Sequence, residues 1–180
     1  MKTKVLCLIV CIGMAAFATA QTKYITKTGH VWFYSHTPIE DIVAHSYQAV
    51  AIVVPSTSSI AVAIPIMSFQ FKKTLMQEHF NENYMESGKY PKATFQGTIK
   101  DMASINIAKN GTYPASVEGD LTIHNVTRKV KADGTVVVKD GKYQVTSKFI
   151  VAVKDYNIAI GSRVAGNIAK EIEVNIDLSF

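Results

Sequence analysis

The chain has 180 residues and a formal net charge of +5, from 19 lysine and arginine residues against 14 aspartate and glutamate residues. The basic residues are scattered and form nothing longer than pairs, which argues against nucleic acid as a partner. Both cysteines, Cys7 and Cys11, lie in an N-terminal segment that we expect to be removed. The mature chain would then have no disulfide, no thiol chemistry and no cysteine metal site.

Residues 1–20 have the three parts of a secretory signal peptide. Lys2 and Lys4 give a cationic start, an uncharged apolar run follows over 5–17, and Ala18-Thr19-Ala20 supplies the small-x-small pattern that signal peptidase reads. The apolar run is shorter than the roughly 20 residues that a membrane-spanning helix needs. We therefore expect a mature domain over residues 21–180 in a bacterial periplasm or secreted, with no stable membrane insertion.

The mature chain is dominated by period-two alternation of apolar and polar residues, which predicts strands with one buried face. Before residue 74 we expect strands at 24–36, 47–54 and 59–71, the last bent at Pro65. After residue 90, the expected strands are 93–99, 104–108, 117–123, 130–136, 143–153 and 172–180. Asn110-Gly111 and Asp140-Gly141 are typical of tight turns, and residues 124–127 connect two further strands.

One segment, residues 74–86, has a helical period instead. Met76, Phe80 and Tyr84 form an apolar stripe at i, i+4 and i+8, with glutamates on the opposite side. Thr74-x-x-Gln77 has the pattern of a capping box. We expect this short helix to pack its stripe onto the strands and to close one end of the sheet.

These elements predict an all-β fold: a single antiparallel β-barrel of about eight strands with one short α-helix, in which the last strand pairs with the first. A barrel of this size is either filled by its own side chains or holds one small ligand. Small residues at inward positions favour empty space, namely Gly97, Gly119, Ala132, Gly134 and Ser147. Gly119 and Gly134 are alternatively bulges or bends that let the strands curl.

Catalytic motifs are missing from the sequence. It contains no G-x-S-x-G, no H-E-x-x-H, no P-loop and no dinucleotide fingerprint, and its five histidines show no ligand spacing. We therefore expect a protein that is not an enzyme and that uses neither a metal nor a cofactor. A hydrolase or isomerase that acts on a bound lipid through His79 or His124 is a less favoured hypothesis.

Three stretches resemble the YceI-like polyisoprenoid-binding family over roughly residues 60–180. The first is Glu78-His79-Phe80 followed by Tyr90-Pro91-Lys92-Ala93-Thr94-Phe95, which is similar to H-[LF] and then Y-P-x-[AI]-x-F. The second is GDLTIHNVTRKV over 119–130, and the third is Asp155-Tyr156-Asn157-Ile158, which resembles D-[FY]-G-[VI]. Asn125 and Asn157 stand where the family usually has glycine, and asparagine tolerates the left-handed conformation well.

The resemblance implies a lipocalin-like barrel that encloses a long-chain isoprenoid or quinone-like lipid, without catalysis. The residues expected to contact this ligand are large, apolar and inward-facing: Phe69, Phe71, Met76, Phe80, Tyr84, Phe95, Leu121, Phe149 and Val151. Filling the space by Gly119→Leu or Ser147→Phe is then expected to block lipid uptake in a folded chain. The alternative is a structural or inhibitory barrel with a filled core that acts through its surface.

Overall fold

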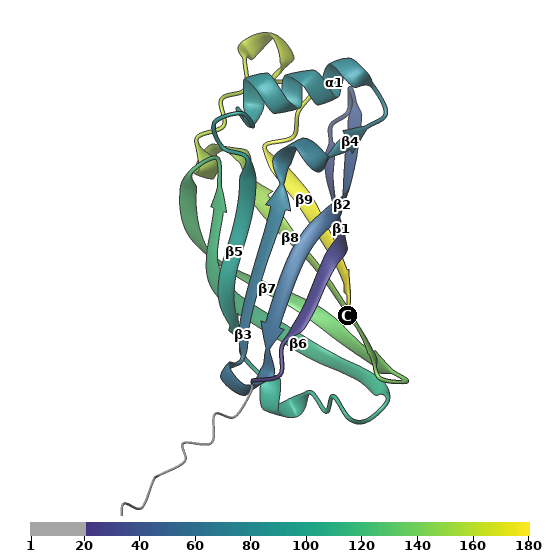
Figure 1. The fold of residues 1–180 in the computed structure, drawn as a ribbon. Helices are drawn as coiled ribbons and strands as arrows, with labels where there is room; N and C mark the ends of the chain where they lie inside the picture. The colour runs from purple at the N-terminus through teal and green to yellow at the C-terminus, as the bar shows by residue number, and fades with distance from the viewer. Residues whose placement is uncertain (1–20) are drawn as a thin grey trace, which may run out of the picture.

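The computed structural model describes residues 21–180, so the predicted signal peptide lies outside the described residues. Eight long strands form a closed antiparallel barrel, and one two-residue strand is added at its rim (Figure 1). The strands are β1 (Tyr24–His36), β2 (Asp41–Val54), β3 (Ser59–Pro65), β4 (Gln70–Phe71), β5 (Lys92–Ile99), β6 (Gly111–Ile123), β7 (Val126–Lys139), β8 (Lys142–Ala152) and β9 (Glu171–Ser179).

The barrel closes because its first strand pairs on both sides. β1 pairs with β2 over most of its length and with β9 from His30–Asp177 to Tyr34–Glu173, and the remaining neighbours follow as β9-β8-β7-β6-β5-β3-β2. The prediction that the last strand pairs with the first is therefore confirmed. Closure satisfies the backbone groups that an open sheet edge would leave unpaired.

Two of the three expected turns are confirmed. The turn expected at Asn110-Gly111 is wrong, because Gly111 begins β6 and no strand precedes it at 104–108. His124 and Asn125 join β6 to β7 with φ values of 50° and 60°, and Asp140 and Gly141 join β7 to β8 with 50° and 77°. Asn157 also has a positive φ, 55°. Asparagine thus occupies the left-handed conformation at both positions where the resembling family has glycine.

One expected strand is absent and another is shorter than expected. Residues 104–108 form no strand: a 3-10 turn at Met102–Ser104 leads into a loop, in which Ile105 is buried against the barrel core. The predicted strand over 59–71 ends at Pro65, where a 3-10 turn (Ile66–Ser68) separates β3 from β4. Proline has no amide hydrogen to continue the strand pairing, which explains why the strand ends at Pro65 and does not merely bend there.

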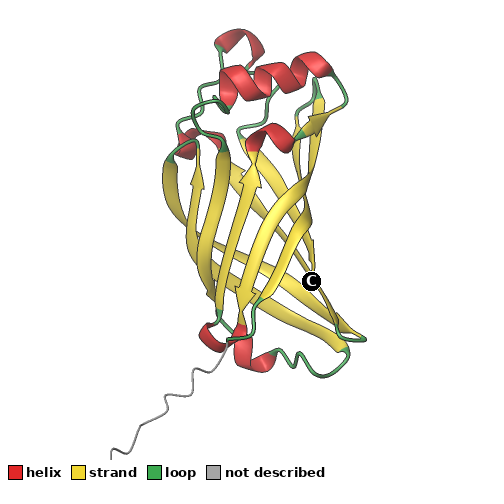
Figure 2. Cartoon of the chain, viewed as in Figure 1, coloured by secondary structure: helices red, strands yellow, loops and turns green. Residues whose placement is uncertain are grey.

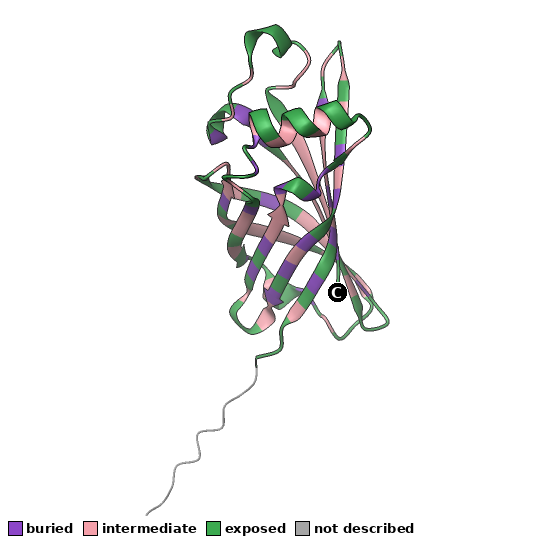
Figure 3. Cartoon of the chain, turned by 45° about the horizontal axis from the view of Figure 1, so that its top comes forward, coloured by how far each residue is buried: buried purple, intermediate pink, exposed green. Residues whose placement is uncertain are grey.

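The helical segment crosses one end of the barrel (Figure 2). It consists of α1 (Thr74–His79) followed by a π-helical turn, Phe80–Tyr84. The predicted capping box is absent, because Lys73 is the N-cap and makes no side-chain cap. The Gln77 side chain instead accepts a hydrogen bond from the Phe71 amide at 3.2 Å, which ties α1 to β4. In Figure 3 the outward side of α1 is exposed, whereas its inward side is only partly so.

The barrel is packed solidly at the end opposite α1. The Tyr24 and Tyr143 rings meet edge to face at 4.8 Å, and the Tyr143 hydroxyl donates to the Ile107 carbonyl at 3.3 Å. Val138 and Leu178 are almost fully buried beside them. The loop between β5 and β6 therefore acts as a plug at this end of the barrel.

Candidate functional site

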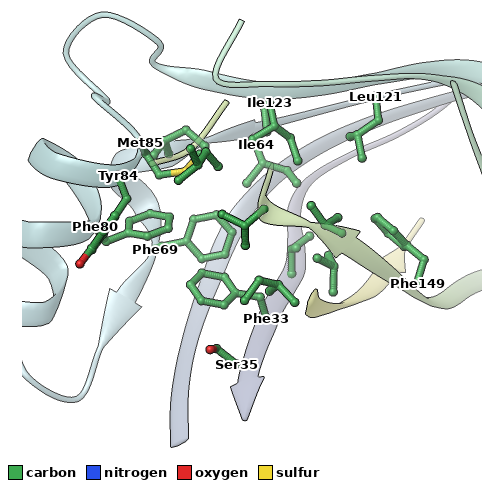
Figure 4. A pocket seen from close by; sticks show the side chains of 18 of the residues that line it. Phe33, Ser35, Ile64, Phe69, Phe80, Tyr84, Met85, Leu121, Ile123 and Phe149 are labelled. Atoms are coloured by element: carbon green, nitrogen blue, oxygen red, sulfur yellow. The ribbon is translucent and has the colours of Figure 1, made fainter. Parts of the chain in front are cut away.

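A cavity of about 360 Å³ lies inside the barrel and is bordered at one end by the helical segment (Figure 4). Of its 38 lining residues, 31 are apolar. The lining comes from the eight long strands, from β4 and the turn before it, from the helical segment and from the connection between β8 and β9. The polar or hydroxyl-bearing ones are Ser35, Glu40, His79, Tyr84, Thr94, Ser147 and Asn167. The volume falls within the roughly 300–1,000 Å³ of small-molecule pockets.

Four phenylalanines form one wall of the cavity below α1. The Phe80 ring lies 5.5 Å from Phe33, 5.7 Å from Phe69 and 5.0 Å from Phe71, measured between ring centroids. Because these rings come from β1, β4 with its preceding turn, and the helical segment, they hold the helical segment against the barrel. Figure 4 shows Phe33, Phe69 and Phe80 side by side, with Leu121 and Phe149 further along the cavity.

The connection between β8 and β9 completes the wall on the side of β1. The Ser35 hydroxyl, which is buried, accepts a hydrogen bond from the Ala169 amide at 2.9 Å. This bond fixes the end of the connection over β1, so that Ile158, Ile160 and Ile168 face the cavity.

Glu40, in the loop between β1 and β2, is the carboxylate that lines the cavity. Its Oε1 accepts from Lys73 Nζ at 2.8 Å, and its Oε2 accepts from the Asn167 amide at 3.2 Å. The Lys73 ammonium, and then the Asn167 amide, lower the pKa of the Glu40 carboxyl. The carboxylate therefore joins three segments at the cavity mouth and stays ionised at neutral pH.

The YceI-like domain profile matches residues 24–180, nearly the whole of the described chain. The chain belongs to the YceI-like family. Comparison with curated proteins gives no match.

Solved structures share this YceI-like fold. A polyisoprenoid-binding domain from Saccharophagus degradans has a TM-score of 0.76 at 13% identity, covering 89% of this chain and 98% of that domain. BcnA of Burkholderia cenocepacia has a TM-score of 0.70 at 18% identity, covering 84% and 96%. The YCEI protein of Campylobacter jejuni has a TM-score of 0.56 at 17% identity, covering 95% and 92%. The expected lipocalin-like barrel is thus confirmed.

The structure places all nine sequence-predicted contact residues of this YceI-like chain on the cavity. They are Phe69, Phe71, Met76, Phe80, Tyr84, Phe95, Leu121, Phe149 and Val151. Their contact with a ligand stays a prediction. The helical stripe and the strand alternation put seven of them on the cavity, whereas Phe69 and Phe71 lie beyond the break at Pro65, outside the strand that was expected to place them.

Sequence reasoning missed two groups of lining residues. The first lies on β1 and β9, where Phe33 and Val174 face inward by the same alternation that defined the strands. The second comprises Ile158, Ile160, Val164 and Ile168 in the β8–β9 connection, which has no strand period. The first group could have been found from the expected closure of the sheet, whereas nothing in local periodicity marks the second.

Three of the five small inward positions do not provide space. A Cβ on Gly119 would lie 2.2 Å from the Gln96 carbonyl oxygen, and one on Gly97 would lie 2.5 Å from that of Glu118. These glycines permit close approach of β5 and β6, and Gly134 does the same against β8. The expectation that Gly119→Leu fills the cavity of a folded chain is therefore wrong. Ala132 and Ser147 do line the cavity.

The two histidines considered for catalysis have different surroundings. His79 lines the cavity from an exposed position, whereas His124 Nε2 lies 2.7 Å from a Glu86 carboxylate oxygen and does not line the cavity. Within residues 21–180, no three His, Cys, Asp or Glu side chains are grouped to hold a metal ion. Within the same range, no helix is long and apolar enough to cross a bilayer.

Proposed function

We propose that this protein is a lipid carrier that encloses a long apolar isoprenoid or quinone-like chain in the cavity of its barrel, without catalysis. The apolar cavity carries the proposal. Protein interiors are close-packed, so a hollow of about 360 Å³ with aliphatic and aromatic walls is unusual unless something fills it. An apolar cavity stays dry and takes up apolar molecules.

Burial supplies the binding free energy in this proposal. Each CH₂ that leaves water contributes about 0.8 kcal/mol, so a branched five-carbon unit contributes a few kcal/mol before ordering costs. The Saccharophagus degradans domain with the same fold is described as polyisoprenoid-binding, which supports an isoprenoid here. The alternative, a barrel with a filled core that acts through its surface, leaves this cavity unexplained.

We further propose that the headgroup of the ligand is uncharged. No lysine or arginine is among the cavity-lining residues, and the ionised Glu40 carboxylate lies at the mouth. A phosphate or fatty-acid carboxylate would face this carboxylate at the mouth, where Lys73 is already paired with Glu40. An alcohol or a quinone can instead accept or share hydrogen bonds there.

Displacement titration tests the proposal. Delipidated protein is first loaded with the neutral apolar fluorophore N-phenylnaphthylamine, and geranylgeraniol or geranylgeranyl phosphate is then added. We expect the alcohol to displace the fluorophore at a concentration about tenfold lower than the phosphate, a difference of about 1.4 kcal/mol. Failure of the protein to bind the fluorophore and both prenyl compounds would reject the carrier function, whereas tighter binding of the phosphate would reject only the uncharged headgroup.

We also propose that the carrier works in the periplasm or is secreted, because residues 1–20 have the pattern of a signal peptide. Export predicts a mature N-terminus at or near Gln21 and release by osmotic shock. Mass analysis of the protein from fractionated cells tests this, and retention of residues 1–20 in the mature protein would contradict it.

A further inference from the structure

Three of the seven polar or hydroxyl-bearing residues that line the cavity lie together at its mouth. They are Ser35 near the end of β1, Glu40 in the β1–β2 loop and Asn167 in the β8–β9 connection. The Asn167 side-chain amide donates to Glu40 at 3.2 Å, and the backbone amide of Ala169, two residues further along, donates to the Ser35 hydroxyl at 2.9 Å. These bonds hold Ser35, Glu40 and Asn167 in one group, the polar end of the cavity.

The Ser35 hydroxyl carries a hydrogen that no group of residues 21–180 accepts. Its oxygen accepts from the Ala169 amide, but a hydroxyl is also a donor. Ser35 is 2% exposed and lines the cavity, and Figure 4 shows it at the edge of the apolar side chains, beyond Phe33. Since a buried donor without an acceptor is unfavourable, a ligand oxygen at the mouth would stabilise this site.

Glu40 and Asn167 supply acceptors beside this donor. The Glu40 carboxylate is paired with Lys73, and each of its oxygens accepts one hydrogen bond and keeps a lone pair for another. Because a carboxylate only accepts, the NH₂ of Asn167 faces it. The Asn167 carbonyl oxygen then points elsewhere, and no described residue donates to it. The polar end thus offers one donor and several acceptors.

This set of groups distinguishes among uncharged headgroups. A ligand hydroxyl can accept from Ser35 and donate to Glu40 at the same time, because a hydroxyl is both donor and acceptor. A quinone carbonyl or an ether oxygen accepts from Ser35 but has no hydrogen to donate, so its lone pairs face those of Glu40. A hydrogen bond to a carboxylate is also stronger than one between neutral groups.

We propose that the polar end formed by Ser35, Glu40 and Asn167 binds the hydroxyl of a prenyl alcohol, with Ser35 donating to the hydroxyl oxygen and Glu40 accepting its hydrogen. This inference rests on the proposed lipid-carrier function and selects an alcohol over a quinone. Ser35 and Glu40 are then specificity-determining residues, and the apolar chain of the ligand fills the rest of the cavity.

Geranylgeraniol and its methyl ether test this inference by the order of their affinities. Both compounds have the same chain and an oxygen that accepts, but only the alcohol donates. Burial alone favours the ether about fourfold, because of its additional methyl group. We expect the opposite order: the alcohol should displace N-phenylnaphthylamine from the wild type at a concentration at least about threefold lower than the ether, since its bond to Glu40 is charge-assisted.

Two variants assign the preference to residues. Glu40→Gln should weaken the alcohol more than the ether. Ser35→Ala should weaken both of them relative to the hydrocarbon of the same chain, because both oxygens accept from Ser35. The matched control is Ser147→Ala: Ser147 also lines the cavity, but its hydroxyl already donates to the Asp133 carbonyl at 2.8 Å, so the ratios among the three ligands should stay as in the wild type.

A wild type that binds the ether more tightly than the alcohol would overturn the inference. So would variants at Ser35 and Glu40 that weaken the alcohol, the ether and the hydrocarbon by one common factor, because that result is expected from a purely structural role at the mouth. Either outcome leaves the carrier function standing. A wild type that binds none of the three ligands and no fluorophore refutes the carrier function, and this inference with it.

Discussion

The substitution Ala132→Leu measures whether the interior of the barrel beside β7 is hollow. Ala132 lies on β7, is buried, and lines the cavity. Leucine adds three carbon atoms at this position, which take the space of about three ligand carbons. At about 0.8 kcal/mol per buried carbon, the ligand loses about 2.4 kcal/mol of binding free energy. That loss corresponds to about 50-fold weaker lipid binding.

The sign of the stability change separates a hollow core from a filled one. If the space is empty, the added carbons enter apolar surroundings and the unliganded protein gains up to about 2 kcal/mol of unfolding free energy. If the core is filled, the same carbons overpack it and cost about 1–3 kcal/mol. Urea unfolding of the delipidated protein gives the stability, and fluorophore displacement by geranylgeraniol gives the affinity.

Ala61→Leu is the matched control for this substitution. Ala61 lies on β3 and is exposed on the outer face of the barrel, so the same added carbons reach solvent. We expect unchanged lipid affinity and a stability change within about 0.5 kcal/mol. A destabilised Ala132→Leu protein with wild-type lipid affinity would refute a ligand cavity at this position.

Two further predictions concern stability. Gly119→Ala should lower the midpoint of urea unfolding, because its Cβ would lie 2.2 Å from the Gln96 carbonyl oxygen. The control Gly88→Ala, whose Cβ would have no atom within 4 Å, should leave the midpoint unchanged, and equal midpoints for the two variants would refute the close approach of β5 and β6. Burial, and then the nearby His45, lower the pKa of His30 below its ordinary 6.5, so the unfolded chain takes up more protons and stability falls as the pH drops below about 6.5. His30→Gln should reduce this fall between pH 7 and 5.5, and equal slopes in wild type and variant would contradict the assignment.

The sequence predicted those parts of the fold that depend on local pattern. The alternation over 172–180 located β9 and its inward face, and Asp140-Gly141 located the β7–β8 turn, because each signal comes from neighbouring residues. The stripe Met76, Phe80 and Tyr84 was placed correctly for the same reason.

The remainder depended on contacts between distant segments. The local pattern predicts a strand at Ile105, but its side chain is instead buried against the barrel core as part of the plug. Gln77 fits a capping box, yet its side chain bonds to the Phe71 amide because β4 lies beside α1. Likewise, Gly119 looks like empty space until β5 is known to bring Gly97 and the Gln96 carbonyl against it. Each outcome required knowing which elements become neighbours.

Native mass spectrometry of the protein, purified without detergent from its own cells, tests the carrier function most directly. The account predicts a bound species whose added mass, after extraction, belongs to an uncharged lipid with an isoprenoid chain. It also predicts that Ala132→Leu, purified in the same way, carries less of this lipid than Ala61→Leu. A wild-type protein that carries no lipid, and that takes up no prenyl alcohol after delipidation, would contradict the account.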